Sequence, residues 1–160
     1  MTCIRFVATL CLTLGLTPVF AATPLDLGTQ LSASERKAFV SGAPVQLGQE
    51  SFQIVSPAIA AKSASGYGSN ETWVVNDRGV VGRNANEVLV GQIDPNLVKT
   101  VADSGALPRV AAATYNPTTR ISSLRFGSFA DAVKARAVLA SRLSGASVTV
   151  PVQYDRPKMR

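Results

Sequence analysis

The chain has 160 residues, a formal net charge of +6 from 16 basic and 10 acidic residues, and no histidine. Without histidine, serine or cysteine nucleophiles activated by a histidine base and the usual zinc sites are excluded. The carboxylates are few and scattered, so no acid and base pair stands out. We therefore expect no enzyme, no cofactor and no metal site.

The first 21 residues have the pattern of a secretory signal peptide. Arg5 precedes an apolar run over residues 6–20, which is too short and too early for a membrane span and meets small residues at Ala21 and Ala22. Cleavage after Ala21 would remove both cysteines, Cys3 and Cys11, so the mature chain has no disulfide. We expect a periplasmic or secreted protein with no membrane association after cleavage.

Residues 22–70 read as a leader. The run "LSASERKAF" predicts a short helix capped by Ser32 or Ser34, with Glu35 placed to complete a capping box with Ser32. The run "VQLGQESFQIV" indicates a strand or a hairpin, and "AAKSASGYGSNE" is typical of a Gly/Ser-rich loop. A soft boundary near residue 70 separates this leader from residues 71–160.

The first elements of residues 71–160 have clear local signals. Two β-prone runs flank the turn residues 76–79 and predict a hairpin, and "NEVLVGQI" predicts a buried strand. Asp94 then caps a helix with Pro95 in its first turn and Gly105 past its end. The apolar residues of that helix, which we expect to share one face, are Leu97, Val98 and Val101.

The remaining elements are a hairpin, a helix and a strand. "RVAAATY" and "RISSLRF" flank a turn at residues 116–119, and "GSFADAVKARAVLASRLSG" predicts a second helix. Its expected apolar side is Val133, Ala137, Ala140 and Leu143. That assignment leaves Arg136 on the apolar face, so either the arginine extends to solvent or the face is wrong. "SVTVPVQY" ends the domain, with Pro151 indicating an edge strand or a bulge.

From Glu87 onward the predicted order is β, α, β, β, α, β. This order predicts an α+β, ferredoxin-like fold, with a four-stranded antiparallel sheet and two helices on one face, preceded by a β-hairpin and a short helical leader. The second face of the sheet would be covered by the leader or would bind a partner.

Several binding functions find little support in the sequence. "SGYGSN" has neither the spacing nor the lysine of a phosphate-binding loop. The basic residues of the last third could form a patch that contacts phosphates, but the central strands of the predicted sheet lack the aromatic pair that stacks bases in RNA-binding folds. We therefore expect no nucleic-acid binding and a solvated basic face. Those basic residues are Arg120, Arg125, Lys134, Arg136 and Arg142. Trp73 and Tyr67 are lone aromatics, for which core or lid positions are favoured.

Three stretches carry a resemblance over residues 86–160. "NEVLVGQID", "ISSLRFGSFADAVKARAVLASRL" and "SGASVTVPVQYDRP" together resemble the propeptide domain of subtilisin-like serine proteases. Such propeptides act as chaperones and inhibitors of their protease. Their sheet packs on two surface helices of the enzyme, and their C-terminal residues lie in the substrate cleft as an added strand. No protease follows in this chain, so we expect a free-standing chaperone and inhibitor.

The resemblance also implies which residues would enter the protease cleft. They are Val152, Gln153, Tyr154, Asp155, Arg156, Pro157, Lys158, Met159 and Arg160. A frayed terminus without function is the alternative for the same residues.

A second resemblance competes with the first. "RFGSFADAVKARAVLASRL" is similar to the Gly-x-Phe strand-to-helix junction of SPOR domains, which bind peptidoglycan on a ferredoxin-like sheet. The first half of such a domain repeats the junction, but "VGQIDPNLV" has no phenylalanine there. Peptidoglycan binding is therefore the alternative function.

Overall fold

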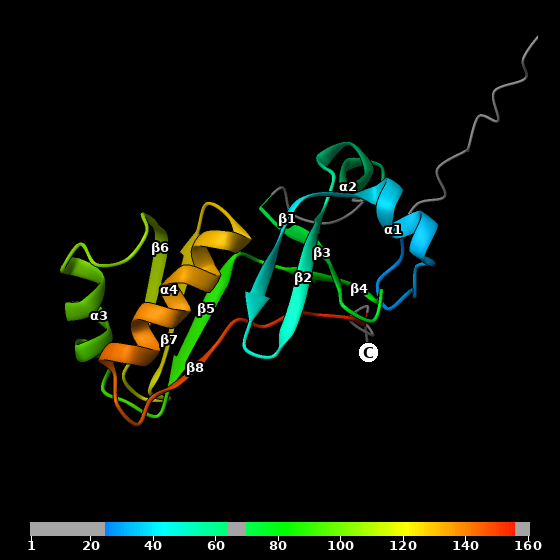
Figure 1. Ribbon diagram of the computed structural model, residues 1–160. Coiled ribbons are helices and arrows are strands. Elements are labelled where there is room, and N and C mark those ends of the chain that lie inside the picture. The colour runs from blue at the N-terminus through cyan, green and yellow to red at the C-terminus, as the bar shows by residue number, and fades with distance from the viewer. Residues whose placement is uncertain (1–24, 64–69, 156–160) are drawn as a thin grey trace, which may run out of the picture.

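The computed structural model describes residues 25–63 and 70–155. Within them the protein is α+β, with two antiparallel four-stranded sheets and four helices (Figure 1). The expected signal peptide, Tyr67 and residues 156–160 lie outside the described residues. In the described part no helix is both long and apolar enough to span a bilayer.

The N-terminal sheet is a meander in which each strand pairs with the next. Its strands, in order, are β1 (Val40–Leu47), β2 (Glu50–Val55), β3 (Thr72–Asn76) and β4 (Val81–Asn84). Helix α1 (Ala33–Phe39) precedes it, and α2 (Pro57–Ser63) connects β2 to β3.

Helix α1 begins as the sequence predicts. Ser32 is the N-cap, its hydroxyl accepts from the backbone N–H of Glu35, and the Glu35 carboxylate accepts from the Ser32 backbone N–H at 2.9 Å. These two bonds form the expected capping box. The Ser32 hydroxyl also donates to the Glu35 carboxylate at 2.7 Å, and this bond, together with the one from the Ser32 N–H, lowers the pKa of Glu35 because both favour the ionised carboxylate.

The arrangement of the leader and the hairpin differs from the expectation. The sequence predicts one sheet with a separate hairpin before it, but β2 of the leader pairs with β3 of the hairpin, with Gln53 opposite Val75. Residues 73–76 of β3 are buried on both faces of the strand. One face packs into the core through Val74 and the other into a second cluster through Trp73 and Val75. A two-stranded hairpin alone is only marginally stable, and here the hairpin joins the leader strands in a second sheet.

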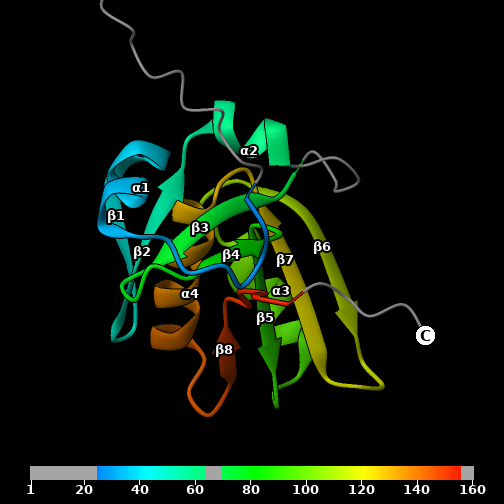
Figure 2. The same ribbon diagram turned by 90° about the vertical axis from the view of Figure 1, so that its right-hand side faces the viewer.

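The C-terminal sheet has the strand order β6-β7-β5-β8, with every neighbouring pair antiparallel (Figure 2). Its strands are β5 (Glu87–Gly91), β6 (Val110–Asn116), β7 (Ile121–Phe126) and β8 (Ser147–Thr149). Helix α3 (Pro95–Asp103) connects β5 to β6, and α4 (Phe129–Arg142) connects β7 to β8. The predicted cap at Asp94 is confirmed, as its side chain accepts from the Asn96 N–H at 2.9 Å.

Two predicted helix faces are wrong in part. In α3, Val98 is fully buried but Leu97 is 50% exposed. In α4, Ala137 and Ala140 are exposed, and the buried side chains are Phe129, Ala132, Ala135 and Leu139. Because alanines occur all around this helix, the apolar pattern does not identify one buried face. The side that is buried is the one on which Phe129 packs into the core.

One core joins the two sheets. Phe52 of β2 and Val74 of β3 pack with the buried side chains of the C-terminal sheet and of α3 and α4. The rings of Phe52 and Phe129 meet edge to face, with centroids 5.8 Å apart. A second cluster, around Trp73, fills the far face of the N-terminal sheet, so the predicted core position of Trp73 is confirmed.

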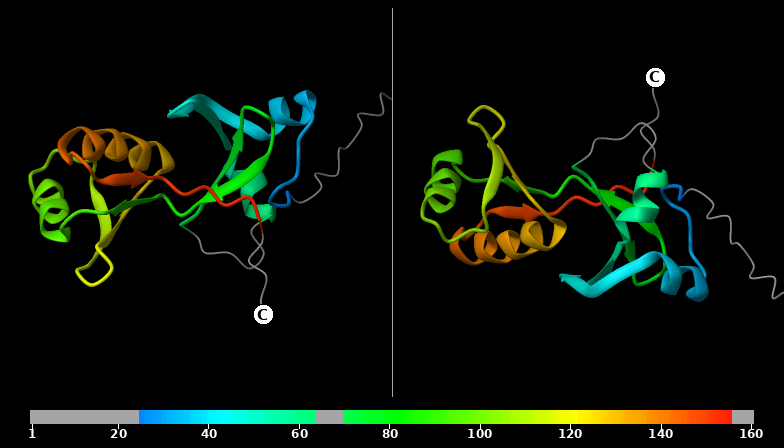
Figure 3. Two further views of the ribbon diagram at one scale, coloured as in Figure 1. Left: turned by 90° about the horizontal axis from the view of Figure 1, so that it is seen from below. Right: turned by 90° about the horizontal axis from the view of Figure 1, so that it is seen from above.

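The chain crosses between the two sheets at two places (Figure 3). The first crossing is the step from β4 to β5, where Asn86 adopts a left-handed φ of 56°. The second is residues 150–155, here called the return segment, which runs from β8 back to β4. β8 ends two residues before Pro151 at an edge of the sheet, as Pro151 indicates.

Candidate functional site

The return segment pairs with the outer edge of β4 through a single bridge. The backbone N–H of Arg83 donates to the carbonyl of Gln153 at 2.9 Å, and the N–H of Gln153 donates to the carbonyl of Arg83 at 2.8 Å. This pair of bonds is an antiparallel bridge. The two residues are 70 positions apart, so the bridge closes a loop that contains the whole C-terminal sheet.

Two glycines make room for the return segment. A Cβ on Gly82 would lie 2.7 Å from Cγ1 of Val152 and 3.0 Å from Cε1 of Tyr154. A Cβ on Gly28 would lie 2.9 Å from the carbonyl oxygen of Tyr154, and Gly28 has a φ of +77°. Both positions exclude any side chain while the return segment is in place.

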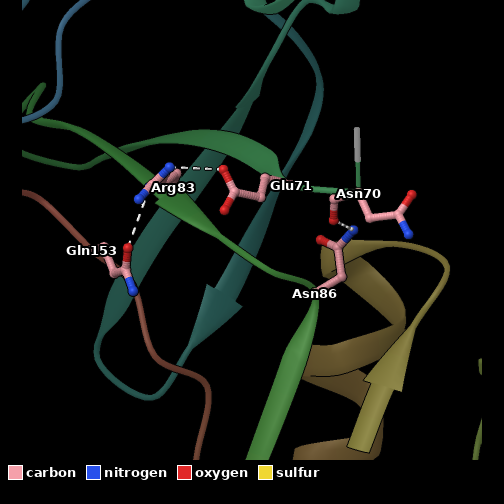
Figure 4. Close-up of polar contacts among 5 residues, drawn as sticks. All are labelled: Asn70, Glu71, Arg83, Asn86 and Gln153. Carbon is pink, nitrogen blue, oxygen red and sulfur yellow. Dashed lines mark hydrogen bonds and ion pairs between the residues drawn. The ribbon is translucent and has the colours of Figure 1, made fainter. Parts of the chain in front are cut away.

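Polar side chains of β4 bond to the return segment, and Figure 4 shows the one from Arg83 to Gln153. Arg83, only 6% exposed, donates through Nη1 to Glu71 at 2.9 Å and through Nε to the side chain of Gln153 at 3.2 Å. Asn84 donates to the carbonyl of Pro151. Arg83 is therefore a buried cation whose charge is balanced by Glu71 and whose Nε–H donates to the return segment.

Asn86 fixes the turn that leads from β4 to β5. Its amide donates to the carbonyl of Asn70 at 3.2 Å, and its carbonyl oxygen accepts from the Thr72 hydroxyl at 2.7 Å. Because Glu71 lies between Asn70 and Thr72, these bonds also hold the partner of Arg83 in position.

Tyr154 ends the packed part of the return segment. Its hydroxyl accepts from the Asn76 amide at 3.5 Å. Burial raises the pKa of the Tyr154 phenol, and Glu50 and Asp77 add to the rise, whereas the Asn76 hydrogen bond and the charge of Arg78 oppose it. The phenol is thus held in its neutral form.

The start of the described chain meets the same edge of β4. The N–H of Gly28 donates to the carbonyl of Val81 and the N–H of Leu31 to the carbonyl of Gly79, both at 2.8 Å. The first and the last described segments therefore lie side by side on β4, with Gly28 against Tyr154.

The predicted partner-binding residues are placed in two groups. Residues 152–154 contact β4 of their own chain, Asp155 is exposed, and residues 156–160 lie outside the described residues. Their partners on β4, which are Gly82, Arg83 and Asn84, were not predicted from the sequence. One feature of the sequence could have indicated this contact. The strand "VGRN" has a glycine and two polar side chains, which are better suited to packing against another backbone segment than to filling an apolar core.

The C-terminal sheet has a second exposed surface, here called the open face. Val88, Val90 and Leu124 are fully buried against α3 and α4, so the alternate residues of each strand point away from the helices. The cross-strand register gives this set: Glu87, Leu89, Ala112, Thr114, Asn116, Ile121, Ser123, Arg125, Ser147 and Thr149. Most of these side chains are small or polar, and Ile121 is 48% exposed.

The basic residues of the last third do not share one surface. Arg125 belongs to the open face, whereas Lys134 and Arg142 are exposed on α4, which covers the opposite face. Arg120 lies in the turn between β6 and β7, with a φ of 53°. A nucleic-acid backbone following one face would thus meet only some of these charges.

A groove runs past the junction of the sheets, at the start of β6. One part of about 410 Å³ is lined by Asn70, Glu71, Asn86 and Phe126, among others, and a neighbouring part of about 520 Å³ by Arg109 and Asp131. Among residues 25–63 and 70–155, no three acidic or thiol side chains gather as metal ligands would.

In comparisons with family models, with curated proteins and with solved structures, no match to this chain is found.

Proposed function

We propose that the C-terminal half, from β5 to β8, is a ferredoxin-like unit. The order β6-β7-β5-β8 with antiparallel neighbours supports this, because each helix then connects two strands that have one strand between them. The two strand–helix–strand connections, β5-α3-β6 and β7-α4-β8, are thus interleaved in the sheet, which is the split βαβ pattern of that fold.

We propose that the protein is an exported, non-enzymatic chaperone and inhibitor of a subtilisin-like serine protease. The observation that carries the proposal is the open face, a sheet surface that no helix or strand of residues 25–63 and 70–155 covers and whose side chains are mostly small and polar. Small side chains let a helix of a partner approach a sheet closely. A stable protein complex buries about 1,200 to 2,000 Å² in total, and the open face with the C-terminal residues offers the surface for it.

The composition of the open face favours a protein partner over peptidoglycan. Its outward side chains, which belong to the described strands, include no aromatic residue on which a sugar ring could stack. Binding to purified peptidoglycan sacculi is the direct test of the alternative. Retention that survives moderate salt would support the cell-wall function, and release by about 0.2 M salt would indicate charge attraction alone.

The chaperone and inhibitor function is tested with a subtilisin-like protease prepared without its own propeptide. We expect the chain to raise the yield of active protease on refolding and, in excess, to inhibit it. Equal yields of active protease with and without the chain would contradict the proposal.

The open face is tested with Thr114→Arg, which places a long charged side chain on an exposed position of β6. We expect inhibition to weaken at least tenfold, about 1.4 kcal/mol, with an unchanged melting temperature. Ala137→Arg, on the exposed side of α4, is the matched control and should inhibit as the wild type does.

The tail is tested by deleting residues 155–160. Because Asp155 is exposed and the contacts with β4 end at Tyr154, the fold should keep its melting temperature. Inhibition should fall at least tenfold if these residues enter the cleft as an added strand. If the truncated chain inhibits as strongly as the full chain, residues 155–160 have no part in inhibition.

A further inference from the structure

We propose that two copies of the chain pair through strand β6, so that their four-stranded C-terminal sheets join into one continuous sheet. This inference goes beyond the proposed function and does not depend on it, because it concerns the edge of the sheet and a second copy of the same chain. The residues that carry it belong to strands that the structure describes.

The first argument is a comparison of the strands that lie at the edges of the two sheets. Strand β1 contains Gly42 and Pro44 where its register with β2 shifts, and β8 is 3 residues long. The edge of β4 is bonded to residues 28–31 and to Gln153. Short strands, prolines, irregular register and covering segments protect an edge from pairing with other chains. By contrast, β6 has 7 residues and contains no proline, glycine or charged residue.

The second argument is the accessibility of β6. Its residues 111–114 are exposed, and among the described strands β7 alone pairs with it. Figure 2 shows β6 at the outer side of the C-terminal sheet. Its register with β7 shifts between Val110 and Ala112 but is regular from Ala112 to Asn116. Alternate residues of an edge strand direct their N–H and C=O groups away from the sheet, so this regular stretch offers a free edge.

The third argument is that the sequence of β6 is suited to pairing with itself. In a symmetric dimer the same strand of each copy meets about a twofold axis, and residues opposite each other lie on the same face of the sheet. The antiparallel register that pairs the whole regular stretch of β6 has Thr114 at the axis, opposite the partner's Thr114. Ala113 then lies opposite the partner's Tyr115, so a small side chain meets a large one. Cross-strand pairs of threonines stabilise a sheet.

Charge and order favour a second copy over other partners at this edge. No charged residue lies between Arg109 and Arg120, so no like charges oppose each other within the paired strands. An extended peptide would lose its conformational freedom on binding, whereas β6 is already held extended by β7. A pair of strands this short is a small contact compared with a standard interface, which buries about 1,200 to 2,000 Å². We therefore expect a weak dimer, with a dissociation constant between about 10 µM and 1 mM.

The test uses substitutions at the proposed axis, where a side chain faces its own copy. In Thr114→Lys and in Thr114→Glu two like charges would lie opposite each other, so each variant should associate at least about fivefold more weakly than the wild type. An equal mixture of the two variants should associate again, because it brings opposite charges together. Thr149→Lys is the matched control, since Thr149 is an exposed threonine of the open face but belongs to β8 at the other edge of the sheet. All three positions are exposed, so the melting temperature should not change.

Two measurements are made on the chain that begins at Ala22, as expected after signal cleavage. Sedimentation equilibrium gives the dissociation constant, and moderate salt should lower it, because two basic copies repel each other. Amide exchange at low and at high protein concentration locates the contact. The amides of β6 should exchange more slowly in the concentrated protein, whereas those of α1 and β1 should not change.

The outcomes decide between a second copy and another occupant of the edge. A chain that stays monomeric up to about 1 mM overturns the inference, as does association that leaves the exchange of β6 unchanged. Wild-type association of Thr114→Lys overturns it as well, since the two lysines would face each other at the axis. Slower exchange of β6 on addition of a subtilisin-like protease, without self-association, would assign the edge to a strand of another protein. Self-association is measured without protease, so its failure would leave the proposed function standing.

Discussion

Arg83 illustrates, at the scale of one residue, what the sequence could not predict. In a hairpin reading "VVGRN" an arginine is expected in water, yet Arg83 is 6% exposed. The chain that covers it comes from residues 151–154, about 70 positions away, and nothing local encodes that contact. The cap residues Ser32 and Asp94 were predictable because their partners lie two or three positions away.

Removing the partner of Arg83 should be costly. In Glu71→Ala the buried guanidinium loses its carboxylate, and we expect the free energy of unfolding to fall by about 1 to 3 kcal/mol, less than for a fully buried pair because Glu71 is partly exposed. Glu50→Ala breaks the exposed pair with Arg78 and should cost below about 1 kcal/mol. Urea unfolding at neutral pH measures both, and equal losses would contradict the difference in burial.

Tyr154 should make stability depend on pH in the alkaline range. Its pKa is raised in the folded state by burial, so the unfolded chain ionises first, near the ordinary value of 10.0. The stabilisation is complete below that pH and is lost as the pH rises through the folded pKa. Tyr154→Phe lacks this titration, while Tyr115, whose pKa burial also raises, is present in both chains.

The measurement is the free energy of unfolding at pH 8 and at pH values above 10. The wild type should lose more stability over this interval than Tyr154→Phe. Parallel losses in the two proteins would show that the Tyr154 phenol is equally solvated in the folded and unfolded chains.

Helix α4 shows, at the scale of an element, where sequence periodicity fails. Its limits follow from Ser128, whose hydroxyl accepts from the Asp131 N–H, and from Gly145 beyond its end. Its buried face does not follow, because Ala at several positions leaves two apolar sides of similar strength. The predicted apolar face contained Arg136, which already indicated that the face was wrong, and in the structure that residue is only half-buried.

The corrected face of α4 predicts a stability difference between substitutions on its buried and its exposed side. Leu139 is fully buried, so Leu139→Ala should cost about 2 to 5 kcal/mol, as should Leu124→Ala on the facing strand β7. Ala137→Ser, on the exposed side, should change stability by less than about 0.5 kcal/mol. Denaturant melts of the three variants measure this, and a change below about 0.5 kcal/mol at both leucines would overturn the assigned faces.

At the scale of the whole molecule, the sequence predicted most elements but not their division into sheets. Strand and helix positions follow from local patterns, and the six elements after Glu87 occur in the predicted order. The pairing of β2 with β3 and the docking of the return segment on β4 are long-range contacts. The open face is read from the same alternation that predicts the strands, whereas the site on β4 needs the tertiary structure.

The shared core predicts that the two sheets unfold together. Phe52 belongs to the N-terminal sheet but packs on Phe129 of α4, so Phe52→Ala should cost about 3 to 5 kcal/mol and lower the stability of both halves. Fluorescence of Trp73, in the N-terminal sheet, and amide exchange in α4 should report the same transition. Two separate transitions would mean that the sheets are independent domains.

The return segment also has a consequence for the order of folding. The N-terminal sheet is built from neighbours in sequence, so its contacts need little loop closure and can form early. In the C-terminal sheet the first strand, β5, pairs with the last, β8, and the bridge from Arg83 to Gln153 spans a still longer loop. Loop-closure entropy makes such contacts late. A chain still emerging would have residues 28–31 bonded to this edge as far as Val81, but nothing bound to it at Arg83. That part of the edge would stay open to other strands until the chain's own C-terminal residues arrived.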